Sequence, residues 1–161
     1  MTPRFAFLSL AAASITAAPA DTGFRPDLFF EGRTRGRGTV DTLTSAPRPL
    51  AVESVGRIAP DGTLILDQAI TLGGKRSART FRIRRLPDGR WRGSLTDASG
   101  PVSAAVTGNT LTLAYPMKRA GMRMSQTLTL QSGGRTLLNR ARVTLLGVPV
   151  ARIEETIEKL D

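Results

Sequence analysis

The sequence contains no cysteine and no histidine among its 161 residues. Without cysteine there are no disulfides, no thiol nucleophiles and no acylated N-terminus, and without histidine there are no serine–histidine relays. Zinc sites built from these two residue types are excluded with them. The adjacent Glu154 and Glu155 would point to opposite faces of a strand, so they do not form a carboxylate pair across a cleft. We therefore expect no enzymatic activity, no cofactor and no metal site.

Long hydrophobic runs are also scarce. The apolar run over residues 5–18 is shorter than the roughly 20 residues that span a bilayer as a helix. Arg4 precedes this run, and Ala18-Pro19-Ala20 follows the small-x-small rule for signal peptide cleavage. We predict that residues 1–20 are a signal peptide cleaved after Ala20, and that the protein is periplasmic or secreted. The alternative interpretation is a buried N-terminal helix.

Aromatic residues make up 5% of the chain, with one Trp and one Tyr. A protein this poor in aromatics lacks the stacking platform of single-strand nucleic-acid binders, so no nucleic-acid partner is expected. Positive charge dominates instead, since 23 Lys and Arg against 13 Asp and Glu give a formal net charge of +10. This balance favours anionic partners such as lipid headgroups, with peripheral contact only. It leaves the oligomeric state open.

The rest of the chain alternates apolar and polar residues in short segments separated by turn signals, which is typical of antiparallel β-structure. Residues 21–28 are expected as an irregular lead-in, and residues 29–161 as one domain. Strands are expected at about 31–41, 50–59, 63–72, 79–86, 90–97, 102–107, 110–117, 122–131, 136–146 and 148–158. The short connections make sequence neighbours antiparallel, and closure removes the two edges. We predict an all-β, up-and-down barrel of about eight to ten strands. Residues 153–161 also fit a helical stripe, so their conformation stays open.

The turns set the expected register. Pro60-Asp61-Gly62 and Pro87-Asp88-Gly89 have the sequence of three-residue hairpin loops, with glycine at positive φ. The second loop would place Arg84 directly opposite Arg92 on the outer face, with Trp91 inside the barrel.

Several short motifs follow one another along the domain. They are Phe29-Phe30-Glu31-Gly32, Gly36-x-Gly38, Asp61-Gly62-x-Leu64-x-Leu66-Asp67, Thr96-Asp97-Ala98-x-Gly100-Pro101-Val102, Gly108-Asn109, Tyr115-x-Met117, Leu138-Asn139-Arg140 and Gly147. With this order and spacing, the chain resembles the bacterial exported family of unknown function DUF3833 over about residues 28 to 160. The resemblance implies a lipocalin-like (calycin-like) barrel exported beyond the inner membrane, with no established activity. Many members look like lipoproteins, from which this chain departs because it has no cysteine.

Two sets of side chains are candidate binding residues. A ligand inside the barrel mouth would be oriented by a polar and aromatic set, namely Trp91, Asp97, Tyr115, Asn139 and Arg140. The alternative is structural, since Asp97 can cap its own turn while Asn139 and Arg140 bridge strands. An anionic surface would be contacted by an arginine set, namely Arg33, Arg35, Arg37, Arg84 and Arg92. The alternative for this set is a solvated outer face.

These candidates support two functions of different classes. The first is a non-enzymatic carrier that binds a lipid or other amphipathic small molecule in the cell envelope. The second is a structural or interaction module that docks through its basic face on an anionic envelope surface. Interior volume separates them, because a small barrel is either filled by its own side chains or holds one ligand. The low aromatic content favours the carrier.

Overall fold

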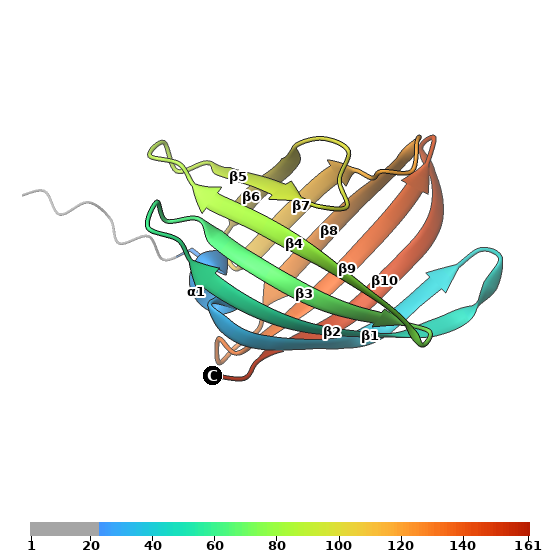
Figure 1. Cartoon of the computed structure of the whole chain (residues 1–161), viewed down its shortest axis with the longest axis horizontal. Helices are drawn as coiled ribbons and strands as arrows, with labels where there is room; N and C mark the ends of the chain where they lie inside the picture. The colour runs from blue at the N-terminus through green and yellow to red at the C-terminus, as the bar shows by residue number, and fades with distance from the viewer. Residues whose placement is uncertain (1–22) are drawn as a thin grey trace, which may run out of the picture.

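The computed structural model describes residues 23–161, and the predicted signal peptide lies outside them. In this part of the chain the elements are α1 (Pro26–Phe30), β1 (Gly32–Thr42), β2 (Ser45–Ile58), β3 (Leu64–Leu72), β4 (Lys75–Arg85), β5 (Trp91–Leu95), β6 (Val102–Thr107), β7 (Thr110–Pro116), β8 (Met122–Leu130), β9 (Thr136–Leu145) and β10 (Val148–Lys159) (Figure 1). The strands close into an antiparallel barrel in which sequence neighbours pair and β10 pairs with β1. The predicted barrel is confirmed, with β2 and β4 starting a few residues earlier than expected.

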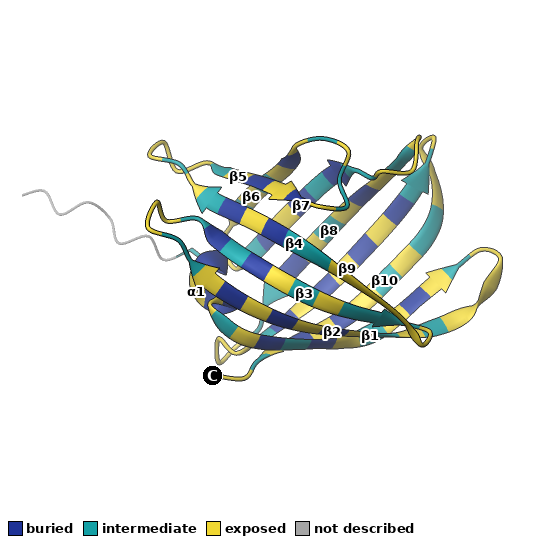
Figure 2. Ribbon diagram, viewed as in Figure 1, coloured by how far each residue is buried: buried dark blue, intermediate teal, exposed yellow. Residues whose placement is uncertain are grey.

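The predicted register is also confirmed. Across the Pro87-Asp88-Gly89 loop, Arg84 lies opposite Arg92 and Ile83 lies opposite Gly93. Buried and exposed residues alternate along most strands (Figure 2), as a strand with one face toward a core requires. The inward residues of the ten strands therefore form the core, and the outward residues carry most of the charge.

One element was missed from sequence. Residues 26–30, which include the end of the expected lead-in and the first two residues of the expected domain, form the short helix α1. It begins at Pro26, a residue whose fixed φ suits the first helical turn. The helix is five residues long, too short to show a helical period in the sequence. Conversely, the ambiguous segment 153–161 is strand as far as Lys159, because pairing with both β1 and β9 satisfies its backbone groups.

Helix α1 covers one end of the barrel. Phe29 and Phe30 are each 5% exposed and join the core. The Lys159 ammonium donates hydrogen bonds to the carbonyls of Leu28 and Phe29, at 3.3 and 3.0 Å, and to that of Glu31. A cation there neutralises the partial negative charge of the helix C-terminus. The α1 end is therefore packed and closed.

The opposite end differs, because no helix of the described residues covers it (Figure 1). Val52 is buried there, yet it does not belong to the continuous core. Leu50 and Ile70 project from the same inner wall, are half-buried, and do not pack against that core either. Ile153 of β10, by contrast, packs against the continuous core. The continuous core therefore does not extend to Leu50, Val52 and Ile70 at this open end.

Candidate ligand site inside the barrel

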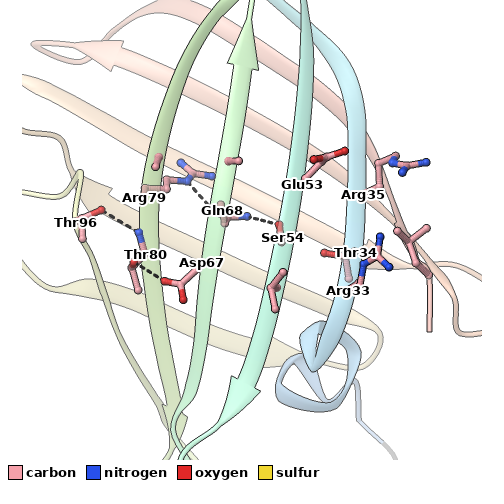
Figure 3. A pocket seen from close by; sticks show the side chains of 14 residues that line it. Arg33, Thr34, Arg35, Glu53, Ser54, Asp67, Gln68, Arg79, Thr80 and Thr96 are labelled. Atoms are coloured by element: carbon pink, nitrogen blue, oxygen red, sulfur yellow. Dashed lines mark hydrogen bonds between the residues drawn. The ribbon is translucent and has the colours of Figure 1, made fainter.

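A row of polar residues crosses the inner wall of β1–β4. Thr34, Ser54, Gln68 and Arg79 stand in direct register on the four strands. The Arg79 Nε donates a hydrogen bond to Gln68 Oε1 at 2.8 Å, and Gln68 Nε2 donates one to Ser54 Oγ at 3.1 Å (Figure 3). These residues alternate with outward ones and share the inner face with buried Leu66. The row therefore places a guanidinium inside the barrel and fixes it through its Nε.

A second polar group lies on the opposite wall, where Asn139 of β9 is directly opposite Glu155 of β10. Both are buried, and Asn139 Nδ2 donates a hydrogen bond to Glu155 Oε2 at 2.9 Å. Gly36 leaves room for this carboxyl group, because a Cβ at that position would lie 1.8 Å from Glu155 Oε1. The prediction that Glu154 and Glu155 face opposite ways is confirmed, since Glu154 is exposed.

Three atoms of this arrangement are buried without a hydrogen-bond partner in the described chain: Thr34 Oγ1, Asn139 Oδ1 and Glu155 Oε1. Buried polar atoms are usually paired, because each unpaired one carries a desolvation penalty of about 1–3 kcal/mol. We call the interior polar residues the polar belt, namely Thr34, Ser54, Gln68, Arg79, Tyr115, Gln126, Asn139 and Glu155. The belt has hydrogen-bonding capacity that the residues around it do not use.

The charge of Arg79 on β4 affects the pKa of two belt residues on other strands, Glu155 of β10 and Tyr115 of β7. Burial raises the pKa of Glu155, against the hydrogen bond from Asn139 and the charge of Arg79, which lower it. Burial also raises the pKa of Tyr115; the charge of Arg79 opposes this shift, and the charge of Asp97 adds to it. Arg79 forms no ion pair within residues 23–161. Its positive charge is therefore available to an anion that enters the barrel.

A narrow cavity of about 50 Å³ lies at the belt. Its polar lining comes from Gln68, Arg79, Tyr115, Gln126, Asn139 and Glu155, and its apolar lining includes Phe30, Leu66 and Leu113. Drug-sized ligands usually occupy about 300–1,000 Å³. The half of the barrel beside α1 is thus filled by side chains, because Phe24, Phe29 and Phe30 pack there. This differs from the roomy interior that the low aromatic content favoured.

The predicted ligand-binding residues do not form one site. Tyr115 and Asn139 belong to the belt, whereas Trp91 is half-buried near the α1 end, beside Phe24 and Gly108. Asp97 lies between β5 and β6, where its carbonyl accepts a hydrogen bond from the Lys118 amide at 3.1 Å. Arg140 is exposed on the outer face and does not reach the interior.

Sequence reasoning missed most of the belt, namely Thr34, Ser54, Gln68, Arg79, Gln126 and Glu155. A signal was present for Gln68, Gln126 and Glu155, because each is a polar residue with apolar inward residues two positions before and after it on its strand. Ile153, Glu155 and Ile157 show this pattern on one strand, as do Leu66 and Gln68 on another.

The predicted arginine set lies on the outer surface in two places. Arg33, Arg35 and Arg37 share the outer face of β1, and the first two border an outer groove of about 700 Å³ over β1–β4 (Figure 3). Arg84 and Arg92 lie on β4 and β5, where Arg84 forms an ion pair with Asp61 at 3.2 Å. Two strands separate the two places, so the set is not one continuous patch.

The fold and the belt define a class: an up-and-down, lipocalin-like barrel with polar groups buried inside. Within this class, the chain belongs to the family described as "Protein of unknown function (DUF3833)", whose model matches residues 6–159. A search of curated proteins found no match. Within residues 23–161 there is no helix with the length and apolarity to cross a membrane, and no cluster of acidic residues that could hold a metal ion.

Solved structures share the barrel. The S-type phycobiliprotein lyase CPES from Guillardia theta is 8% identical, with a TM-score of 0.60 over 84% of this chain and 90% of that one. Rv2717c from M. tuberculosis is 15% identical, with a TM-score of 0.57 over 85% and 99%. A protein of unknown function from the DUF3598 family of Nostoc punctiforme is 12% identical, with a TM-score of 0.60 over 89% and 53%. At these identities the likeness concerns the fold.

Proposed function

We propose that this protein is an exported, non-enzymatic barrel that binds one small amphipathic molecule in the cell envelope, with the polar end of the ligand at the belt. The observation that carries the proposal is the pair of buried, unpartnered oxygens of Asn139 and Glu155, which line one cavity with the Arg79 guanidinium. A third unpartnered oxygen, that of Thr34, lies in the polar row of β1–β4. A purely structural interior would pair such atoms or replace them with apolar groups. A ligand that hydrogen-bonds to them would remove their desolvation penalty.

The chemistry of the belt favours an anionic polar end. Arg79 is held by its Nε, and its guanidinium also interacts with the Tyr115 hydroxyl. The Nη hydrogens that remain can donate to a carboxylate or a phosphate. The raised pKa of Glu155 acts in the same direction, because a neutral carboxyl group would not repel the ligand and could donate a hydrogen bond to it.

The apolar part of the ligand would lie toward the open end. The belt cavity of about 50 Å³ takes only a headgroup-sized fragment. Beyond it, Leu50 and Ile70 are half-buried and do not pack against the continuous core, whereas Ile153 of β10 does. A hydrocarbon segment between the walls would bury these side chains, at about 25 cal/mol for each Å² of apolar surface removed from water. Pockets at the mouth of a barrel are a common arrangement for small ligands.

Export is the second part of the proposal. It is supported by Arg4, the apolar run over residues 5–18 and the Ala18-Pro19-Ala20 cleavage pattern. Because the chain has no cysteine to acylate, the mature protein would begin at Asp21 and be free in the periplasm or outside the cell. Intact mass of the protein purified from its host tests this part. A protein that keeps Met1 in the cytoplasm contradicts it.

The binding site is tested by titrating the purified mature protein with a fluorescent fatty-acid probe, dansyl-undecanoic acid. Arg79→Gln removes the interior charge, and Arg82→Gln, three residues along β4 and exposed, is the matched control. We expect the Kd for the probe to rise about tenfold in Arg79→Gln, the equivalent of one lost charge-assisted bond. The control should stay within about twofold of wild type. Equal affinities in the two variants, or no binding by wild type, would contradict the proposal.

A further inference from the structure

A second groove lies outside the barrel, on the face of β8, β9 and β10, and has a volume of about 410 Å³. It is lined by Ser125, Thr127, Arg140, Ala141, Arg142, Arg152, Ile153 and Glu154. Three of these residues are arginines and two carry hydroxyl groups, whereas one is acidic. The groove lies behind the wall that carries Asn139 and Glu155, so it is separate from the belt.

The pairing of the strands concentrates the positive charge. Arg142 of β9 is directly opposite Arg152 of β10, and Ser125 of β8 is opposite Arg142 on its other side. Like charges directly opposite each other across two strands are destabilising. Elsewhere the chain compensates such a contact, since Arg84, opposite Arg92, forms an ion pair with Asp61.

At this groove a carboxylate is close but forms no ion pair, because Asp41 of β1 is directly opposite Arg152 on its other side without a salt bridge between them. Neither Arg142 nor Arg152 forms a hydrogen bond or ion pair through its side chain within residues 23–161. Glu154 is opposite Arg140 in the register, at one edge of the groove, and forms no ion pair there. The donors of both opposed guanidiniums are therefore free, and Arg142 lies between Ser125 and Arg152 in the register.

We propose that this groove binds a phosphate group, as a soluble phosphate ester or as a phospholipid headgroup. Two guanidiniums on neighbouring strands offer planar pairs of N–H donors that match the oxygens of a tetrahedral anion. Ser125 and Thr127 add hydroxyl donors on the adjoining strand. An anion between Arg142 and Arg152 removes their repulsion, so phosphate binding and the stability of this face are coupled.

The test measures the Kd for inorganic phosphate from its effect on the melting temperature, with chloride at matched ionic strength as the reference. Arg152→Gln removes one of the opposed charges. Arg76→Gln removes an exposed arginine on β4, with the same change in net charge. We expect phosphate to stabilise wild type and Arg76→Gln equally, and the Kd to rise at least about tenfold in Arg152→Gln. Stabilisation no greater than that by chloride, or an unchanged Kd in Arg152→Gln, would overturn the proposal.

A second arm identifies the source of the phosphate. The three proteins are sedimented with vesicles of phosphatidylglycerol and phosphatidylcholine in equal amounts, and with vesicles of phosphatidylcholine alone. Binding to the anionic vesicles that Arg152→Gln loses and Arg76→Gln keeps assigns the groove to a lipid headgroup. Phosphate binding without vesicle binding assigns it to a soluble phosphate ester. Vesicle binding that survives in Arg152→Gln, in the absence of phosphate binding, counts against the groove.

Discussion

Phe30→Ala tests whether α1 is an integral part of the barrel core. The Phe30 side chain is 5% exposed. A phenylalanine buries about 150–250 Å², which at about 25 cal/mol/Å² corresponds to about 4–6 kcal/mol. This is an upper bound, because the denatured chain already buries part of the surface. Allowing for what alanine retains and for the cavity it leaves, we expect a loss of about 3–5 kcal/mol in the free energy of unfolding.

Urea unfolding followed by circular dichroism measures this loss. With an m-value of about 2 kcal/mol/M, the midpoint should fall by about 2 M. The matched control is Leu28→Ala in the same helix, because Leu28 is 52% exposed and should change the stability by less than about 0.5 kcal/mol. A loss below about 1 kcal/mol in Phe30→Ala, or equal losses in the two variants, would show that α1 does not close this end of the barrel.

The remaining predictions concern the register, the belt and the seam of the barrel, which is the pairing of β1 with β10. Trp91→Ala should lose about 2 kcal/mol of stability, less than a fully buried ring, whereas Arg92→Ala should change it by less than about 0.5 kcal/mol; equal effects in urea unfolding would contradict the register. Because burial raises the pKa of Glu155 in the folded state, the folded state binds the proton more tightly. The corresponding stability is greatest below the unfolded pKa and is lost as pH rises through the folded pKa. Glu155→Gln should therefore flatten the decline of stability as the pH rises above about 4.5, the ordinary pKa of the group, and an unchanged profile would contradict the burial of this carboxyl group. Gly38→Ala should destabilise more than Gly36→Ala in thermal unfolding, because the added Cβ would meet a β10 backbone carbonyl at 1.9 Å rather than a side-chain carboxyl at 1.8 Å; the reverse order would refute this account of the seam.

Strand order and register could be predicted from local signals. The Pro-Asp-Gly loops determine which residues face each other, so the pairing of Arg84 with Arg92 follows from the loop alone. The position of Arg140 could also have been predicted, because Leu137, Asn139 and Ala141 are the inward residues of that strand and Arg140 alternates with them. The choice of Arg140 as a ligand-binding residue considered its charge but not its outward position in the alternation of the strand.

The belt and the interior volume could not be predicted in the same way. Whether Arg79 and Glu155 act on one cavity depends on how far the strands are staggered when β1 closes on β10, which no local pattern specifies. The volume depends on which side chains fill the interior. Phe29 and Phe30 decide it from a helix of five residues that has no visible period.

The central claim is that the barrel carries an amphipathic molecule at its polar belt. Native mass spectrometry of the protein purified from its own cell envelope, followed by organic extraction, tests this claim most directly. We predict a fraction of wild type with one extra mass of a few hundred daltons, extractable into organic solvent, and a smaller fraction in Arg79→Gln than in Arg82→Gln. Bare apo-protein mass in all three proteins would contradict the claim.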